Sequence, residues 1–294
     1  RAFWLKAADG VRIRVGLWRH DGARGTVFLL PGRTEYVEKY GRAADELRLR
    51  GYAMLTVDWR GQGLADRPLD DKLSGHVGDF AEYQLDMDAM LVFARAQRLP
   101  EPYYMIAHSM GGCIGLRSLT RGLPFKAAAF TAPMWGILIA AWMRPLAIAL
   151  TTASRWLNFD NRYAPGTGAK TYVLEAPFTG NSLTTDAEMW DYMRQQALAH
   201  PDLTLGGPSL GWLKAALTEC HALTQQPSPE VPALVALGTQ ERIVDVGPIH
   251  ARMTVWPRGT LDIYQGCEHE VLMERASARD NFFESATKLF HKNR

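Results

Sequence analysis

A single stretch of sequence decides the fold of this chain, Tyr103-Tyr104-Met105-Ile106-Ala107-His108-Ser109-Met110-Gly111-Gly112. An apolar, β-prone run ends abruptly at Ser109, and helix-forming residues follow from Cys113 to Arg121. A strand, a sharp turn and a helix in that order are typical of a nucleophile elbow, in which a serine is held on a strained turn above a parallel sheet. Small residues are needed on both sides of the serine, because strand and helix approach closely there. We therefore predict that Ser109 is a nucleophile, with a helix-capping serine as the alternative.

A second serine matches the literal pattern G-x-S-x-G, in Gly207-Pro208-Ser209-Leu210-Gly211. No strong apolar strand precedes it, and Pro208 would fix φ and remove an N–H just before the serine. At Ser109 the first glycine of the pattern is replaced by Ala107, which is still small. We therefore interpret Ser209 as a loop residue.

Buried-type apolar runs alternate with amphipathic segments along most of the chain. This alternation predicts an α/β fold, a mostly parallel central sheet with helices on both faces. The predicted strands are 11–17 (an early antiparallel strand), 26–30, 53–58, 103–108, 127–130, 233–237 and 259–264, and the predicted helices are 36–50, 80–99 with Asp79 as N-cap, 113–121 and 276–290.

The alternation stops between Met134 and about Ser228. This part is helix-like and rich in tryptophan, and it is interrupted by Pro-Gly-Thr-Gly and Leu-Gly-Gly-Pro. We therefore predict a core made of residues 1–133 and 229–294, with residues 134–228 as a helical insertion that lies over the sheet.

Composition narrows the class of protein. Of the 294 residues, 47% are apolar and 22% charged, which is ordinary for a globular protein with a sizeable core. The net charge is +2, and there is no basic cluster interleaved with aromatic residues, so nucleic acid is not an expected partner. Three widely spaced cysteines without a C-x-x-C motif fit a reducing compartment.

The longest apolar stretch, 135–157, contains Arg144-Pro145 and Arg155, so we predict no membrane-spanning helix.

A serine hydroxyl needs a base that takes up its proton as it attacks. His269 lies in Tyr264-Gln265-Gly266-Cys267-Glu268-His269, between the last predicted strand and the last predicted helix. Sites in open α/β sheets form at the carboxyl ends of the strands, so His269 is the predicted base. His108 neighbours the serine, but adjacent side chains on a sharp turn point apart. The other histidines lack such a position.

The base needs an acid that holds its tautomer and stabilises the imidazolium. Glu241 follows the predicted strand 233–237, again at a carboxyl end, and is the predicted acid. Asp245 is the rival, although it can equally cap a helix that starts near Val246. Glu241 itself has the alternative of a solvated loop charge.

A tetrahedral intermediate also needs N–H donors for its oxyanion. At a nucleophile elbow these are the N–H after the nucleophile, here Met110, and an N–H from the loop after an early strand. That loop is Pro31-Gly32-Arg33, and the Arg33 N–H is the candidate. The alternative is that Pro31-Gly32 is an ordinary turn.

These motifs together resemble the α/β-hydrolases of the monoacylglycerol lipase and bacterial lysophospholipase branch, over nearly the whole chain. The matching segments are His108 to Gly112, the Asp-x-Arg-Gly-x-Gly of Asp58 to Gly63, Gly238 to Arg242 and Tyr264 to His269. The order Ser109, Glu241, His269 is also the one found in α/β-hydrolases. Three departures are Pro31 where many relatives have histidine, Ala65 in place of a frequent serine, and Glu241 in place of aspartate.

The resemblance implies a serine hydrolase that cleaves a carboxylic ester of a lipid-like substrate through an acyl-enzyme. A lysophospholipid or a monoacylglycerol is the first expectation, and neither a metal nor an organic cofactor is implied. Residues 134–228 would form a lid over the serine, and the candidate substrate contacts are Gly32, His108, Trp135, Leu138 and Trp142.

The apolar lid surface predicts either peripheral contact with a membrane or ordinary packing on the sheet. We expect a cytoplasmic protein, with any membrane contact at the inner face. Alternative activities on the same scaffold are those of a carboxylesterase, a thioesterase or an aminopeptidase that captures an amine through Glu175, Asp186 or Glu188. A non-catalytic ligand-binding protein and an interaction module that uses the lid are further alternatives.

Overall fold

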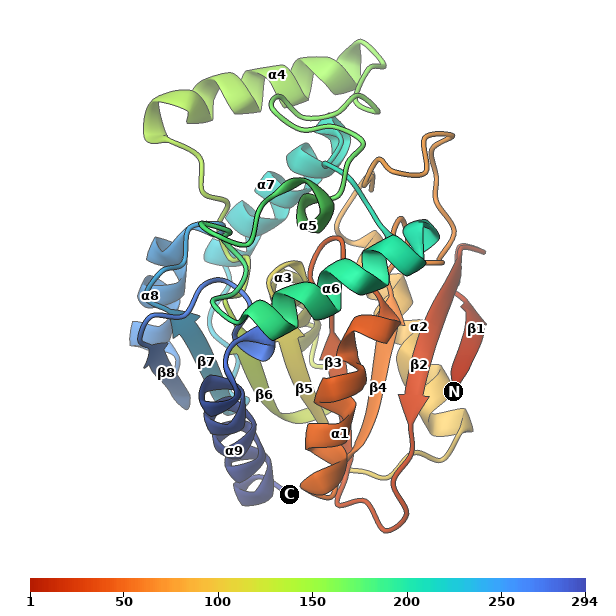
Figure 1. Cartoon of the computed structure of the whole chain (residues 1–294), viewed down its shortest axis with the longest axis vertical. Coiled ribbons are helices and arrows are strands. Elements are labelled where there is room, and N and C mark those ends of the chain that lie inside the picture. The colour runs from red at the N-terminus through yellow and green to blue at the C-terminus, as the bar shows by residue number, and fades with distance from the viewer.

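The computed structural model describes residues 1–294, with the side chain of Ala141 excepted. Eight strands form one sheet in the order β1-β2-β4-β3-β5-β6-β7-β8 (Figure 1). The first two strands pair antiparallel and β2 runs antiparallel to β4, whereas all later neighbours are parallel. The strands are β1 (Ala2–Lys6), β2 (Arg12–Trp18), β3 (Thr26–Leu30), β4 (Ala53–Asp58), β5 (Tyr103–His108), β6 (Phe125–Thr131), β7 (Ala233–Gly238) and β8 (Gly259–Tyr264). The predicted mostly parallel sheet is confirmed.

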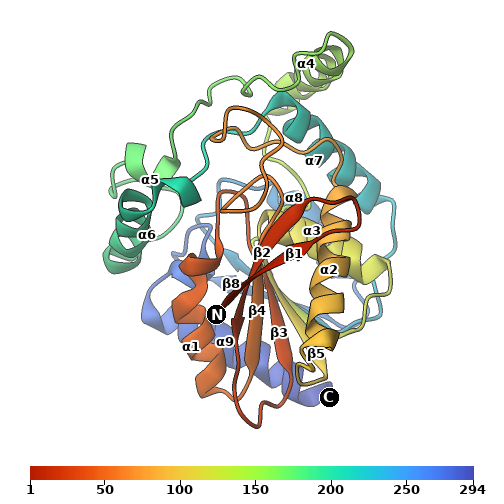
Figure 2. The ribbon, with the colours of Figure 1, turned by 90° about the vertical axis from the view of Figure 1, so that its right-hand side faces the viewer.

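The central strands are apolar throughout because helices cover both faces of the sheet. In β3, Phe28 and Leu30 point into one hydrophobic cluster, and Val27 and Leu29 point into the other. Figure 2 shows the helices on the two sides. The first cluster is completed by α2 (Glu82–Ala96), α3 (Met110–Thr120) and α8 (Val246–Val255), and the second by α1 (Gly41–Leu49) and α9 (Ala276–Lys292).

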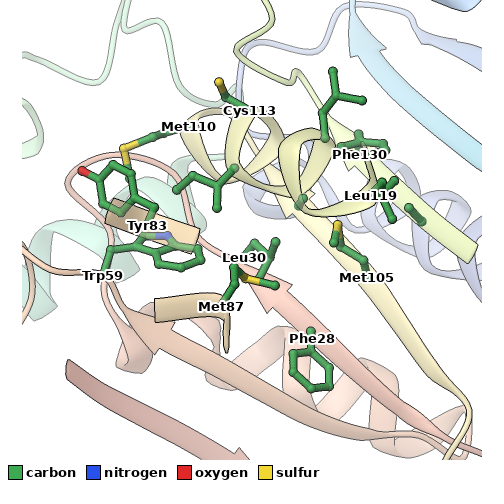
Figure 3. Close-up of a cluster of buried hydrophobic side chains, with 14 of the residues drawn as sticks. Phe28, Leu30, Trp59, Tyr83, Met87, Met105, Met110, Cys113, Leu119 and Phe130 are labelled. Atoms are coloured by element: carbon green, nitrogen blue, oxygen red, sulfur yellow. The ribbon is translucent and has the colours of Figure 1, made fainter. Parts of the chain in front are cut away.

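The core beneath the start of α3 is built from large side chains (Figure 3). Trp59 and Tyr83 meet edge to face, with ring centroids 5.8 Å apart, and both are buried with Met110 and Leu30. Such close packing gives the turn at Ser109 a rigid base.

The segment between β6 and β7 contributes no strand to the sheet among the described residues. It contains α4 (Arg144–Trp156), α5 (Tyr172–Glu175), α6 (Ala187–Ala199) and α7 (Leu210–Thr224), with 3₁₀ turns at Ala141–Met143 and Pro201–Leu203. Figures 1 and 2 show α4 as the outermost helix, beyond α7. The helical content agrees with the expectation for residues 134–228, and the boundaries of that segment stay a prediction.

Three local features differ from what the sequence predicts. Strand β1 was missed because it is an edge strand that is half exposed and gains its order from pairing with β2. The helix expected over 36–50 begins as a 3₁₀ turn, Val37–Tyr40, before α1. Asp79 does not cap α2, whose N-cap position is Ala81; instead the Asp79 Oδ1 accepts the Ala81 N–H at 2.9 Å.

Among the helices described, none combines the length and the apolar character needed to cross a membrane.

Candidate active site

Ser109 lies where the chain turns from β5 into α3. Its backbone has φ 49° and ψ −116°, a region that residues other than glycine rarely occupy, so the turn is strained. The side chain makes no capping hydrogen bond to α3, which argues against a helix-capping serine. The Ser109 N–H donates to the Thr131 carbonyl of β6 at 3.1 Å. The turn therefore has the strand, turn and helix geometry of a nucleophile elbow.

Gly111, two residues after the serine, has no room for a side chain. A Cβ there would lie 2.1 Å from the carbonyl oxygen of Leu30 and 2.5 Å from that of Pro31. Both oxygens belong to the backbone, so neither can move aside as a flexible side chain would. The absence of a Cβ is what lets α3 approach the end of β3.

We expect Gly111→Ala to lower the free energy of unfolding by about 3 kcal/mol, because the new methyl group collides with backbone atoms. Urea denaturation followed by tryptophan fluorescence measures the effect. The control is Gly168→Ala, since a Cβ at Gly168 would meet nothing within 4 Å. Equal stabilities of the two variants would contradict the tight fit at Gly111.

His269 and Glu241 lie 28 residues apart in sequence and meet at the carboxyl ends of β7 and β8. The Nδ1 of His269 is 2.6 Å from the Oε2 of Glu241. A carboxylate can only accept a hydrogen bond, so Nδ1 carries the proton and Nε2 of the neutral ring is unprotonated. The two side chains are 4% and 1% exposed. Water therefore competes little for this hydrogen bond.

The Glu241 carboxylate is oriented by its own loop. Its Oε1 accepts the N–H of Ile243 at 2.6 Å and that of Val244 at 3.0 Å. Burial alone would raise the pKa of this carboxyl, but the hydrogen bond and charge of His269, together with the two N–H donors, lower it. Glu241 is therefore ionised at neutral pH.

Asp245, the rival acid, has other partners. Its Oδ1 accepts the Gly247 N–H at 3.0 Å as the N-cap of α8. Its Oδ2 lies 2.7 Å from the Arg144 guanidinium. The structure thus brings Glu241 to His269 and uses Asp245 as a helix cap.

The loop after β3 lies directly against Ser109. A Cβ on Gly32 would be 3.2 Å from the Ser109 Cβ. Two side chains from the loop after β4 hold this loop in place. The Trp59 indole N–H donates to the Pro31 carbonyl at 3.0 Å, and the Gln62 amide donates to the Gly32 carbonyl at 2.9 Å.

Both predicted oxyanion donors are backbone N–H groups in this region. Because the peptide bond is planar and trans, a Gly32 carbonyl held by Gln62 directs the Arg33 N–H to the opposite side. The Arg33 guanidinium donates to the Gly206 carbonyl at 2.9 Å, and burial lowers its pKa to about 10. Met110 is the first residue of α3, where N–H groups have no acceptor within the helix.

Ser109 and His269 line the same cavity, which has a volume of about 550 Å³. Cavities of this size are common small-molecule sites. Part of the lining is charged, with Arg33, Glu35, Lys39 and Glu270. Another part is largely apolar, with Tyr172, Val173, Leu183, Met193, Leu205 and Ile243.

The predicted substrate contacts divide into two groups. His108 lines the cavity and Gly32 adjoins Ser109. Within the described part of the chain, Trp135, Leu138 and Trp142 do not line it. The sequence shows that residues 135–157 are largely apolar, but it does not show which way each side chain points.

Those three side chains have other surroundings. Trp135 is buried, stacks on Trp256 at 5.9 Å between ring centroids, and donates its indole N–H to the Gly112 carbonyl at 3.1 Å. Trp135 therefore packs against the first turn of α3, which follows Ser109. Leu138 and Trp142 are 54% and 78% exposed.

Ser209 is fully buried and caps α7. Its hydroxyl accepts the Trp212 N–H at 3.0 Å and lies 2.8 Å from the Nδ1 of His76. Both hydrogen bonds of the buried Ser209 hydroxyl serve the structure. This agrees with the interpretation of Ser209 as a residue outside the site.

Sequence reasoning missed a buried charged cluster beside the site. The Lys39 Nζ lies 2.6 Å from a carboxylate oxygen of Glu35 and 2.6 Å from one of Glu270. Glu35 and Lys39 are four residues apart in sequence and follow the Pro31-Gly32 loop, and Glu270 follows the predicted base. The i, i+4 spacing of Glu35 and Lys39 was the signal in the sequence that could have indicated an ion pair, since opposite charges at this spacing attract each other.

The same cluster contains the one set of potential metal ligands found among the described residues, formed by Glu35, His108 and Glu270. The Lys39 ammonium lies between the two carboxylates and supplies the positive charge that a metal ion would supply there. Burial lowers the pKa of His108 to about 3, which keeps its ring uncharged at neutral pH.

The acids considered for amine capture are mostly engaged elsewhere. Asp186 caps α6 by accepting the Glu188 and Met189 N–H groups, and Glu188 pairs with Arg42 at 2.7 Å. Glu175 does line the cavity, and its carboxylate lies 3.4 Å from Lys170.

Comparison with known proteins agrees with this geometry. The sequence profile of the Hydrolase_4 family, described as serine aminopeptidase, S33, matches residues 21–276. Lysophospholipase L2 of Escherichia coli K12 is 29% identical over 298 aligned residues, which cover 97% of this chain and 86% of that protein. A probable lysophospholipase L2 of Haemophilus influenzae is 28% identical, over 90% of this chain and 83% of that protein.

A solved structure shows the same fold. A soluble variant of monoglyceride lipase from Saccharomyces cerevisiae superposes with a TM-score of 0.74 at 19% identity, covering 98% of this chain and 94% of that one.

Proposed function

The chain belongs to the Hydrolase_4 (serine aminopeptidase, S33) family, and on that premise we propose that it is a serine hydrolase that cleaves carboxylic esters of lipid-like substrates. A lysophospholipid or a monoacylglycerol is the proposed substrate class. The observation that carries the proposal is the shared cavity of Ser109 and His269, with His269 held by Glu241 at 2.6 Å. The names of the two bacterial relatives and of the yeast lipase support the choice of a lipid ester.

In the proposed mechanism, Ser109 attacks the ester carbonyl and His269 takes its proton. Since Nδ1 of His269 is engaged by Glu241, Nε2 is the nitrogen that accepts the proton. Glu241 stays ionised and stabilises the resulting imidazolium. The imidazolium then protonates the leaving alcohol, and water hydrolyses the acyl-enzyme by the same route.

The N–H groups of Arg33 and Met110 are proposed to hold the oxyanion. Trp59 and Gln62 fix the loop before Arg33, so this donor is oriented before the substrate arrives. Such preorganised donors act on charge that develops in the transition state, and the loss of one typically lowers the rate by about 10² to 10³.

The two kinds of cavity lining fit an ester with one acyl chain. The apolar residues suit a hydrocarbon chain, and the charged residues near Ser109 suit a polar head group. In this proposal, residues 134–228 form the lid, since Tyr172, Val173 and Leu205 of that segment line the cavity.

The test is fatty-acid release from long-chain lysophospholipid, monoacylglycerol and short synthetic esters, with the Ser109→Ala variant in parallel. We expect Ser109-dependent cleavage of a long-chain lipid ester. Activity confined to short esters would contradict the lipid proposal. Cleavage of aminoacyl p-nitroanilides in preference to esters would favour the aminopeptidase alternative.

We also propose that α4 rests on the lipid surface that holds the substrate. Its inner side buries the polar residues Thr151 and Ser154, whereas its outer side exposes apolar ones. Helices that face water normally show the reverse pattern. The exposed set on and beside α4 is Leu138, Trp142, Met143, Leu146, Ile148, Trp156 and Leu157.

We expect the double variant Trp142→Ser/Trp156→Ser to bind phospholipid vesicles at least about tenfold more weakly, because two large apolar side chains no longer enter the bilayer. Co-sedimentation with vesicles measures binding, and kcat for a soluble short ester should stay at the wild-type value. The matched control is Leu49→Ser/Val92→Ser, which changes two exposed apolar residues elsewhere on the surface. Equal vesicle binding by both double variants would rule out α4 as the contact.

A further inference from the structure

Three charged side chains are buried beside the proposed active site. Glu35, Lys39 and Glu270 are 3%, 5% and 6% exposed. Lys39 bridges the two carboxylates at 2.6 Å each. Taking charged groups out of water lowers stability, and apolar residues of similar volume often fill such a place with a gain in stability. Packing alone therefore does not explain this arrangement.

One end of the bridge holds the loop with the proposed oxyanion donor. The Glu35 Oε2 accepts the Gly32 N–H and also the Tyr40 hydroxyl, the latter at 2.5 Å. The Gly32 N–H and its carbonyl are thus both fixed, the first by Glu35 and the second by Gln62. This fixes the orientation of the peptide that carries the Arg33 N–H.

The other end of the bridge holds the loop with the proposed base. Glu270 directly follows His269, and its N–H donates to the Leu183 carbonyl at 2.8 Å. Its Oε2 accepts from Lys39. Lys39 therefore connects Glu35, in the segment after β3, to Glu270, in the segment after β8. Lys39 and Glu270 are 231 residues apart in sequence.

The pKa shifts of the cluster favour a lasting ion pair between Lys39 and Glu35. Burial alone would raise the pKa of Glu35, but the neighbouring groups, above all the Lys39 charge, together outweigh it and the pKa falls to about 2. Burial also works against a charged Lys39, but Glu270 and Glu35 outweigh it and raise its pKa. The Lys39 ammonium and the Glu35 carboxylate therefore persist together at neutral pH. Burial, with the nearby Glu35 charge, raises the pKa of Glu270, and the ammonium of Lys39 opposes that rise.

We propose that Lys39 is a positioning residue that clamps the oxyanion loop to the base loop, so that the Arg33 N–H and His269 are held as one unit around Ser109. The inference rests on the proposed function and adds residues that do not touch the reacting atoms. Such a clamp acts on the transition state, in which both the oxyanion donor and the base must be in place.

The test compares Lys39→Met with Lys39→Arg, which keeps a charge able to bridge the carboxylates. We expect Lys39→Met to lower kcat for a soluble short ester by about 10², close to the loss of one oxyanion donor, with little change in KM. Affinity for a boronic acid that forms a tetrahedral adduct with Ser109 should fall by the same factor. Lys39→Arg should restore most of kcat.

The control for a merely structural ion pair is Arg117→Met. Arg117 joins α3 to Glu219 of α7 through two hydrogen bonds of 2.6 and 2.8 Å. Its removal should lower the thermal midpoint and leave kcat and boronate affinity unchanged. A Lys39→Met variant that behaves like Arg117→Met, or that changes KM alone, would overturn the clamp.

Glu270→Gln tests the clamp if Lys39→Met fails to fold, because it is isosteric and leaves the Lys39–Glu35 pair intact. A lower kcat with unchanged KM is expected, and a wild-type kcat would refute the proposal. Failure of the proposed function is a separate result, namely wild-type protein without esterase activity or with activity that survives Ser109→Ala.

Discussion

We expect Ser109→Ala to lower kcat for ester hydrolysis by about 10⁶ without loss of the fold, by analogy with the removal of triad residues in other serine hydrolases. The substitution deletes the atom that would bond to the substrate carbonyl. Binding and the oxyanion donors remain, so a small residual rate is expected. The Ser109 hydroxyl makes no capping bond to α3, so urea denaturation should give nearly the wild-type free energy of unfolding.

The matched control is Ser209→Ala, at the other serine that the sequence offers. This change removes a helix cap and a bond to His76, so it should destabilise the protein by about 1 to 2 kcal/mol. Its kcat should stay close to wild type. Loss of activity in Ser209→Ala together with retained activity in Ser109→Ala would reverse the assignment of the nucleophile.

The contrast between these two serines shows what the sequence can predict. Local context predicted the strand, the turn and the helix around Ser109, since an apolar strand, small flanking residues and a following helix constrain one another within ten residues. The same kind of reasoning identified the central strands, which are buried on both faces and therefore continuously apolar. Edge strand β1 was not predicted, because its extended conformation is stabilised by pairing with β2 and its own sequence shows no clear strand pattern.

The acid and the base were predicted from the positions of Glu241 and His269 after strands, and the structure places their side chains in contact. What the sequence could not supply is the direction of side chains in irregular segments. Trp135 and Trp142 are both tryptophan and lie seven residues apart in sequence. Trp135 is nevertheless buried against the turn at Ser109, whereas Trp142 is exposed. Tertiary packing, which has no local signal, decides between them.

The buried cluster of Glu35, Lys39 and Glu270 was not predicted, for a related reason. Lys39 lies on a segment predicted as an amphipathic helix, where a charged residue is normally assigned to the solvent face. Its burial depends on Glu270, which is remote in sequence. A long-range ion pair of this kind can be proposed from a structure but not from either segment alone.

Glu241→Ala should lower kcat by about 10⁴, by analogy with the loss of the acid in other triads. The carboxylate holds the proton of His269 on Nδ1 and, being ionised, stabilises the imidazolium as Ser109 attacks. Without it, the ring can rotate or take the other tautomer, so that Nε2 no longer accepts the serine proton. KM for a short ester should change little, because Glu241 does not contact the substrate in the proposed mechanism.

Asp245→Asn is the control, since it lies four residues away and caps α8 instead of contacting His269. Asparagine is itself a good N-cap, so kcat and stability should both stay close to wild type. The substitution Glu241→Asp adds a geometric test. The Oε2 lies 2.6 Å from His269 while Oε1 accepts two backbone N–H groups, and a side chain one methylene shorter cannot keep both sets of contacts in an unchanged loop. We therefore expect Glu241→Asp to fall between wild type and Glu241→Ala. A harmless Glu241→Ala combined with an inactive Asp245→Asn would show that the loop rearranges during catalysis and that Asp245 is the acid.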